Sequence, residues 1–192
     1  MAVIYLAGGC FWGMERLFRS LSGVTEVTAG YANGDRPEHA RYETVCTGTT
    51  GFRETVRVDY DPAGISLEHL LFAFFASIDT ETPNRQGPDI GSQYQSGVYW
   101  GDGYAEAAVR RIADVEAAGV SYFAVELMPL ASFFPAEAYH QRYLEKHPGG
   151  YCHIGPGKLA ALARYPFRAE SYTRPAARLL REWREWRESA GL

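Results

Sequence analysis

Near its N-terminus the sequence passes from a strand pattern, through two glycines and a cysteine, into a helix pattern. Residues 2–7 form a short apolar run rich in strand-forming side chains. After Cys10, apolar side chains recur at helical spacing as far as Leu21, with charged side chains on the opposite face. Gly8 and Gly9 allow a sharp turn that a Cβ atom would obstruct. We therefore predict a strand, a tight turn and a helix, with Cys10 at or beside the helix N-terminus.

Cys10 is the residue of this turn that can carry chemistry. The free N–H groups and the positive dipole end of a helix N-terminus favour a thiolate over a thiol. Most cysteines are small buried hydrophobes, but a turn from strand to helix presents its residue at the edge of a sheet. We therefore interpret Cys10 as a nucleophile. Phe11 and Trp12 cannot both face the core, so at least one should form an apolar wall beside the thiol; packing of Trp12 under a loop explains the spacing equally well.

The rest of the chain alternates between strand and helix patterns. The order strand-helix-strand-strand-helix-strand matches the ferredoxin-like split βαβ pattern. We therefore predict an α+β fold, with a two-layer ferredoxin-like core in which helices cover a mixed sheet. After the first helix, the expected elements are strands over 24–28 and 54–60, a helix over 67–78, a strand over 97–100, a helix over 104–118, a strand over 122–127, a short helix over 135–144 and a last helix over 175–187.

Three stretches interrupt these patterns. Residues 29–51 and 79–96 show little periodicity and are predicted to be long irregular loops. Residues 147–157 are rich in glycine and proline and are predicted to be a flexible segment. The last helix has an apolar face that includes Trp183 and Trp186. Docking of that face onto the domain is the simpler interpretation, and binding of a partner module is the alternative.

Composition and charge exclude several classes of function. The net charge is −4 and no basic stretch is interleaved with aromatic residues, which argues against a nucleic-acid partner. No apolar run approaches the roughly 20 residues that a membrane span needs. No charged segment followed by a long apolar one marks a secretory signal, so we expect a cytoplasmic protein.

The cysteines do not form a recognisable framework. Cys10, Cys46 and Cys152 are odd in number, far apart and without a CxxC pair, so neither a disulfide scaffold nor a zinc ribbon is indicated. His147 and His153 lie near Cys152, but their spacing is wrong for a four-ligand zinc site, so we expect no metal. Reactive chemistry is the better use of these thiols.

A nucleophilic thiol normally needs an acid or a base beside it. His140 is the only acceptable histidine base, and a solvated or core histidine is the better interpretation of it. The irregular stretches and strand ends instead contain Glu54 and Asp89, together with Tyr42 and Tyr94. A carboxylic acid flanked by tyrosines suits protonation of a substrate oxygen, and desolvation of Glu54 by aromatic residues would raise its pKa for that task.

Several blocks of the sequence resemble the A-type peptide methionine sulfoxide reductases. The first is Gly-Cys-Phe-Trp-Gly at residues 9–13, the signature of that family. The match runs in order from about residue 3 to about residue 156. The further blocks are residues 42–48, 50–54, 84–94, 138–141 and 150–153.

The resemblance implies a role for each candidate residue. Cys10 would attack the sulfur of a methionine S-sulfoxide, free or in proteins, whose methyl group lies against Phe11 and Trp12. Glu54 would protonate the sulfoxide oxygen, with Tyr42 and Tyr94 as hydrogen-bond partners, and Asp89 would bind the polar part of the substrate or support the site. Cys152 would then convert the sulfenic acid on Cys10 into a disulfide. Thioredoxin would reduce that disulfide, and no cofactor is implied for what we expect to be a monomer.

The sequence departs from the family pattern in places. Residues 78–83 differ from the usual loop, which puts the local loop geometry in question. No further cysteine follows Cys152, which favours a two-thiol cycle over a three-thiol relay. Cys46 matches a family cysteine outside the cycle and is expected to be buried and structural. We accordingly divide the chain into a catalytic domain over 1–156 and a C-terminal extension over 157–192.

Two rival functions remain at this point. A thiol peroxidase would also form a sulfenic acid, but it would not account for the aromatic pair after Cys10 or for Glu54 with its tyrosines. A redox sensor or sulfoxide-binding module would bind without turnover, and the presence of Cys10, Glu54 and Cys152 together argues against it.

Overall fold

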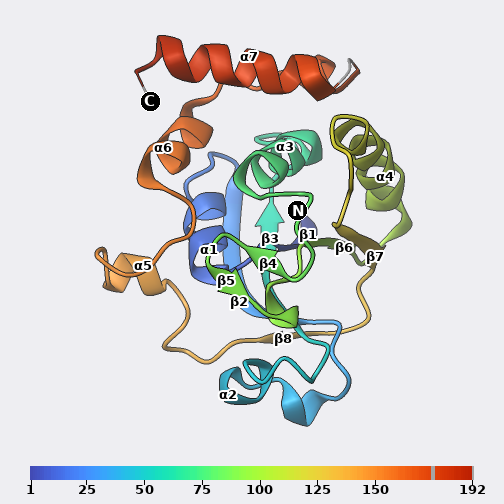
Figure 1. Cartoon of the computed structure of the whole chain (residues 1–192), viewed down its shortest axis with the longest axis vertical. Helices are drawn as coiled ribbons and strands as arrows, with labels where there is room; N and C mark the ends of the chain where they lie inside the picture. The colour runs from blue at the N-terminus through green and yellow to red at the C-terminus, as the bar shows by residue number, and fades with distance from the viewer. Residues whose placement is uncertain (174–175, 192) are drawn as a thin grey trace.

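The structure, a computed structural model of the chain, describes residues 1–173 and 176–191 (Figure 1). Its centre is a six-stranded sheet with the strand order β7-β6-β1-β3-β2-β8. Neighbouring strands are antiparallel except for β6 and β7, which are parallel, so the sheet is mixed. The strands are β1 (Ala2–Ala7), β2 (Val24–Ala32), β3 (Arg53–Tyr60), β6 (Gly97–Trp100), β7 (Glu126–Pro129) and β8 (Phe133–Pro135).

The four central strands form the predicted core. Helix α1 (Phe11–Arg19) lies between β1 and β2 in the chain, and helix α3 (Leu67–Ser77) lies between β3 and β6. The strand order β6-β1-β3-β2 with these two helices is the order of a ferredoxin-like split βαβ unit. Helix α4 (Gly103–Ala117) then leads to β7 at the edge of the sheet. The predicted α+β class and its core are confirmed.

Alternation along β1 separates two apolar clusters, because successive side chains of a strand point to opposite faces. Ile4 and Leu6 are fully buried in the main core, together with side chains of α1, α3 and α4. Tyr5 and Ala7 belong to a smaller cluster on the other face, where the rings of Tyr5 and Phe133 lie 5.2 Å apart. Phe133 of β8 and Leu130, which precedes this strand, therefore pack on the face of the sheet opposite the helices.

The irregular stretches are more ordered than the sequence predicts. β2 continues to Ala32 because its second half pairs with both β3 and β8. The other elements in these stretches are too short for periodicity to reveal them. They are a 3₁₀ turn (Pro37–His39), helix α2 (Tyr42–Val45), the hairpin strands β4 (Arg85–Gln86) and β5 (Asp89–Ile90), and a second 3₁₀ turn (Ser92–Tyr94).

The helix predicted over 135–144 is wrong. β8 ends at Pro135, and the next helix, α5, covers only Tyr143–Lys146. Between them, the side-chain amide of Gln141 accepts a hydrogen bond from the N–H of Ala29 at 3.0 Å and donates one to its carbonyl at 2.8 Å. The Gln141 side chain therefore completes the backbone hydrogen bonds of β2 at Ala29, where pairing with β8 ends. A continuous helix over these residues is not compatible with this position of Gln141.

The strand predicted over 122–127 is shifted. Regular pairing begins only at Glu126, which lies opposite Gly97 of the parallel strand β6, and continues to Pro129. The preceding N–H of Ala124 instead donates to the carbonyl of Thr80. Contacts with segments distant in sequence therefore decide where this strand begins.

The C-terminal extension packs on the helical layer. It contains α6 (Pro156–Arg164), a 3₁₀ turn (Ala169–Thr173) and α7 (Ala176–Ser189), which lies across α3 in Figure 1. The ring of Phe72 on α3 lies 4.9 Å from that of Tyr165 and 5.8 Å from that of Trp183. Pro175, the predicted first residue of the last helix, lies outside the described residues. The described part of α7 thus docks through the apolar face that contains Trp183.

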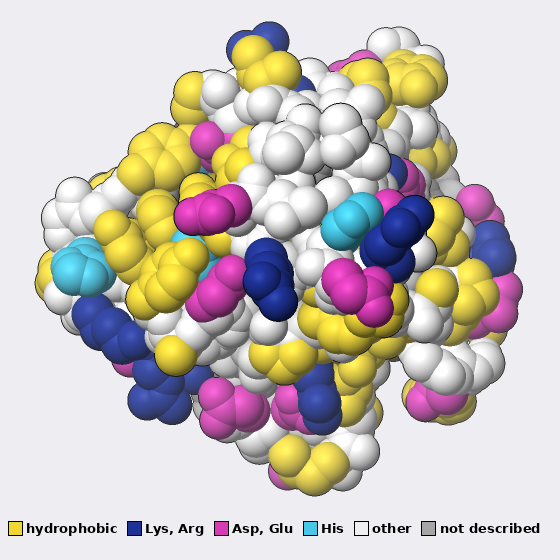
Figure 2. All heavy atoms as spheres, turned by 90° about the horizontal axis from the view of Figure 1, so that it is seen from below, with side chains coloured by type: hydrophobic (Ala, Val, Ile, Leu, Met, Phe, Trp, Pro, Cys, Tyr) yellow, Lys and Arg dark blue, Asp and Glu magenta, His cyan; other side chains and the backbone are white. Residues whose placement is uncertain are grey.

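The face of the molecule seen in Figure 2 carries side chains of both charges. Figure 2 shows acidic and basic side chains intermixed with apolar ones on the face seen from below, with no continuous basic field. In the part of the chain that the structure describes, no helix is long and apolar enough to cross a membrane.

Candidate active site

The turn before α1 has the sharp geometry that its glycines predict. Gly9 has a φ of +82°, and a Cβ atom there would lie 2.7 Å from the Cβ of Gln86. A Cβ atom on Gly8 would lie 2.7 Å from the terminal methyl of Met14. Cys10 follows as the N-cap residue of α1. Both glycines are therefore needed for the chain to pass this close to the loop and to the core.

Burial and the helix N-terminus have opposite effects on the pKa of the Cys10 thiol. Its side chain is 7% exposed, and this burial, with the nearby charge of Glu54, raises the pKa of its thiol well above the ordinary value. The amides of Trp12 and Gly13 at the helix N-terminus oppose this shift but do not overcome it. Desolvation therefore outweighs the helix N-terminus, which by itself would favour the thiolate. Cys10 rests as a neutral thiol.

Glu54 lies beside this thiol. It stands near the start of β3 with 2% of its surface exposed, and its Oε2 accepts a hydrogen bond from the N–H of Phe11 at 3.0 Å. Burial raises the pKa of Glu54 to about 8, and the charge of Asp89 adds to the rise while the Phe11 amide opposes it. Glu54 is therefore mostly protonated at neutral pH and can give up a proton near the sulfur of Cys10.

The two tyrosines predicted for the site come from separate loops. Tyr42 begins α2, and Tyr94 ends the second 3₁₀ turn. Burial raises the pKa of both phenols. For Tyr42 the charge of Cys46 and a hydrogen bond to it come next, and the charges of Glu54 and Cys10 contribute to both shifts. Both hydroxyls therefore stay neutral and can donate hydrogen bonds close to Cys10 and Glu54.

The aromatic pair after Cys10 divides into a buried and a partly exposed member. Phe11 is 1% exposed in the core, whereas Trp12 is partly buried and stacks on Tyr143 with centroids 3.8 Å apart. The indole N–H of Trp12 donates to Nδ1 of His140 at 3.1 Å. Burial lowers the pKa of His140, so this histidine is a neutral acceptor that orients Trp12.

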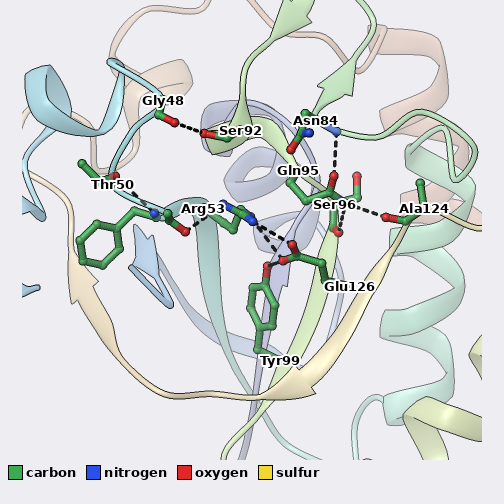
Figure 3. Close-up of polar contacts among 12 residues, drawn as sticks. Gly48, Thr50, Arg53, Asn84, Ser92, Gln95, Ser96, Tyr99, Ala124 and Glu126 are labelled. Carbon is green, nitrogen blue, oxygen red and sulfur yellow. Dashed lines mark hydrogen bonds and ion pairs between the residues drawn. The ribbon is translucent and has the colours of Figure 1, made fainter. Parts of the chain in front are cut away.

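Two polar anchors that the sequence did not indicate hold the loop of Tyr94 (Figure 3). Ser92 Oγ donates to the carbonyl of Gly48 at 2.7 Å, which ties this loop to the one after α2. Gln95 accepts from the N–H of Asn84 at 2.7 Å and donates to the carbonyl of Ala124 at 2.6 Å. Single buried polar residues carry no periodic signal, so only the tertiary structure reveals these anchors.

A third anchor holds the start of β3 next to Glu54 (Figure 3). Arg53 forms an ion pair with Glu126 of β7 at 2.8 Å, and Tyr99 donates to the same carboxylate at 2.8 Å. Arg53 also donates to the carbonyl of Gly51 at 2.8 Å. These bonds lie on the face of the sheet opposite the helices, and they hold the backbone of β3 in place next to Glu54.

The segment of Cys152 packs on the first turn of α1. A Cβ atom on Gly13 would lie 3.3 Å from Cys152 Sγ and 2.9 Å from the His153 ring. Tyr151 donates to Asp89 Oδ2 at 2.9 Å, and Cys152 Sγ donates to the carbonyl of Ile154 at 3.1 Å. The structure thus brings Cys152 to the same helix end as Cys10 and Glu54.

Gly13→Ala tests this packing. Alanine favours a helix over glycine by about 0.5–1 kcal/mol. The new methyl would nevertheless meet the His153 ring at 2.9 Å. Because this segment has no regular structure, we expect it to move away while α1 stays folded. Formation of a Cys10–Cys152 disulfide should slow at least about tenfold with the melting temperature little changed, as measured by thiol loss and calorimetry. An unchanged rate would contradict the packing described here.

The structure also shows where Cys46 lies and how the possible metal ligands are arranged. Cys46, expected to be buried, is exposed at the C-terminal end of α2, because Val45 is the residue that this one-turn helix buries in the core. Within the described residues, no three His, Cys, Asp or Glu side chains are grouped so that they could hold a metal ion.

Comparisons with known proteins point to one family. The model of the family described as peptide methionine sulfoxide reductase matches residues 2–169, which include every residue of this site. The peptide methionine sulfoxide reductase MsrA of Alkaliphilus metalliredigens is 48% identical over 157 residues, which cover 80% of this chain and 98% of that protein. The protein of the same name from Picrophilus torridus is 44% identical over 155 residues, which cover 79% and 87%.

Solved structures agree with this. The chain superposes on reduced Mxr1 from Saccharomyces cerevisiae with a TM-score of 0.75 and 36% identity, covering 80% of this chain and 90% of that one. Methionine sulfoxide reductase A of Corynebacterium diphtheriae gives a TM-score of 0.71 and 35% identity, covering 79% and 77%.

Proposed function

Because the chain belongs to the peptide methionine sulfoxide reductase family, we propose that its Cys10 site reduces the S epimer of methionine sulfoxide, free or in proteins. The observation that carries this proposal is the buried carboxyl group of Glu54, which accepts a hydrogen bond from the amide that follows Cys10 and whose pKa is raised by burial to about 8. A sulfoxide oxygen must be protonated before it can leave sulfur, and this carboxylic acid supplies the proton at the reacting thiol.

The first step transfers oxygen from the substrate to Cys10. Cys10 Sγ attacks the sulfoxide sulfur while Glu54 protonates the oxygen, and the carboxylate so formed takes the thiol proton. The oxygen ends on Cys10 as a sulfenic acid, and methionine is released. Tyr42 and Tyr94 donate hydrogen bonds to the oxygen, since both phenols stay neutral in this site.

Substrate recognition rests on the walls around Cys10. Trp12, held by His140 and stacked on Tyr143, offers a rigid apolar surface for the methyl group on the substrate sulfur, and Phe11 supports that wall from the core. Asp89 supports the site, because its charge favours the protonated form of Glu54.

The second step regenerates the enzyme. Cys152 attacks the sulfenic acid, a Cys10–Cys152 disulfide forms and water leaves. Mxr1 of Saccharomyces cerevisiae has been solved in complex with Trx2, which makes a thioredoxin our candidate for the reductant. In this cycle, thiol groups supply all the electrons that reduce the sulfoxide. We further propose a cytoplasmic monomer, with a catalytic domain over 1–156 and the extension over 157–192.

A single-turnover assay tests this function. Wild-type protein without reductant, given each epimer separately, is expected to release one methionine per chain from the S epimer and none from the R epimer, with loss of two thiols. Cys152→Ser is the matched control, and it should release the same methionine with loss of one thiol. Release from neither epimer by a folded wild type would refute the proposal and favour a sensor, while faster turnover of hydrogen peroxide would favour a peroxidase.

A further inference from the structure

His153 occupies a position that the two-thiol cycle leaves unexplained. A Cβ atom on Gly9 would lie 3.3 Å from its Nε2, and one on Gly13 would lie 2.9 Å from its Nδ1. The imidazole therefore packs against the backbone on both sides of Cys10. Neither ring nitrogen is accessible, and neither makes a hydrogen bond of good geometry within the described residues, although the carbonyl of Gly8 lies near the ring. Buried polar atoms without partners are rare in folded proteins and call for an explanation.

The same point of α1 brings this ring next to Cys152. The position of a Cβ atom on Gly13 lies 3.3 Å from Cys152 Sγ and 2.9 Å from His153 Nδ1. The thiol and the ring nitrogen therefore face one small volume at the first turn of the helix. This volume adjoins Cys10, which precedes Gly13 by one helical turn.

The resolving step requires a proton to move in that volume. Cys152 must lose its thiol proton, and the hydroxyl on Cys10 must gain one before it can leave as water. Burial raises the pKa of the Cys152 thiol, and the backbone of Ile154 and the charge of Arg16 oppose this rise only in part, so the thiolate does not form readily unaided. Glu54, which accepts a hydrogen bond from the N–H of Phe11, serves the preceding step.

We propose that His153 carries this proton, an inference that rests on the proposed sulfoxide reductase cycle. The ring accepts the proton of Cys152 as its sulfur attacks Cys10, and delivers it to the departing hydroxyl. One S–S bond forms, the S–O bond of the sulfenic acid breaks, and water carries away the transferred proton. His153 thereby acts through Cys152 as a positioning and proton-transfer residue, and it is unchanged at the end.

The surroundings of His153 suit this role. Burial lowers the pKa of the imidazole, so it rests as a free base that can accept a proton. The charge of Asp89 and the Gly8 carbonyl favour the protonated ring, whereas Lys158 disfavours it. The protonated state is therefore accessible but not stable, as a proton carrier requires.

The test separates the two steps in a single turnover without reductant. His153→Gln is expected to release methionine at the wild-type rate, within about twofold, and to form the disulfide about 10²-fold more slowly, the usual scale for loss of acid–base assistance. The sulfenic acid should accumulate and be trapped by dimedone. His147→Gln, an exposed histidine of the same segment, is the matched control and should behave as wild type.

Two readouts distinguish proton transfer from a packing role. In the wild type, the rate of disulfide formation should rise with pH through the lowered pKa of His153 and then level off. In His153→Gln it should rise only at the higher pH where Cys152 ionises. His153→Ala should recover disulfide formation when imidazole is added, whereas His153→Gln should not.

Disulfide formation at the wild-type rate in His153→Gln would overturn the inference. So would a slower rate with the wild-type pH profile and no rescue of His153→Ala by imidazole. Absence of methionine release from the wild type itself would instead refute the proposed function, so the two failures are distinguishable.

Discussion

Cys10→Ser is expected to lower reduction of methionine S-sulfoxide by more than about 10³-fold, below the detection limit of a steady-state assay with excess dithiol. A serine hydroxyl is far less nucleophilic than a thiol and cannot take up the oxygen as a sulfenic acid. The side chain is 7% exposed and its replacement is nearly isosteric, so the fold should be retained. Methionine release measured by chromatography, with circular dichroism of the variant, checks both statements.

Cys46→Ser is the matched control for this experiment. Cys46 is an exposed thiol at the end of α2 that interacts with Tyr42, and a serine hydroxyl can keep this hydrogen bond. Its replacement should therefore leave the rate within about twofold of wild type. If Cys10→Ser retained activity while Cys46→Ser lost it, the nucleophile would have to be reassigned.

Glu54→Gln is expected to lower the rate of the first step by about 10²–10⁴-fold, the usual contribution of a positioned proton donor. The glutamine carbonyl can still accept the hydrogen bond from the Phe11 N–H, so the turn before α1 should keep its shape. What is lost is the acidic proton. Single-turnover methionine release at pH 7 measures the effect, with the exposed Glu43→Gln as the control.

The pH dependence of the wild type gives a second measure of Glu54. Only the protonated acid can donate, and its pKa is about 8, so the first-step rate should fall as the pH rises above about 8. That decline should be missing from the residual rate of Glu54→Gln. A wild-type rate that does not change between pH 7 and 9.5 would exclude Glu54 as the donor.

The stability of the fold should follow the same pKa. Folding raises the pKa of Glu54, so the folded state binds this proton more tightly than the unfolded chain does. The resulting stability is fully present below the unfolded pKa and is lost as the pH rises through about 8. Above that pH, Glu54→Gln should unfold at a higher urea concentration than wild type, by a free energy on the order of a few kcal/mol.

The features that were correctly predicted are those encoded by neighbouring residues. The turn at Cys10 follows from two glycines and the change from a strand pattern to a helix pattern, which specify backbone geometry locally. The helix that begins after Ser66 follows from the same kind of signal, and its cap bond to the His69 N–H confirms the boundary. Gln141 instead forms hydrogen bonds with the backbone of β2, which is distant in the sequence, and here periodicity predicted a helix that the structure does not contain.

By itself, the sequence determined the order of the core elements and the family, and it predicted which residues react, because motifs and periodicity are properties of adjacent residues. Only the tertiary structure decided their chemical states. It showed that burial overrides the helix N-terminus at Cys10 and raises the pKa of Glu54, and that His153 lies between Gly9 and Gly13. These outcomes depend on desolvation and contact between segments far apart in the chain, which no local pattern records.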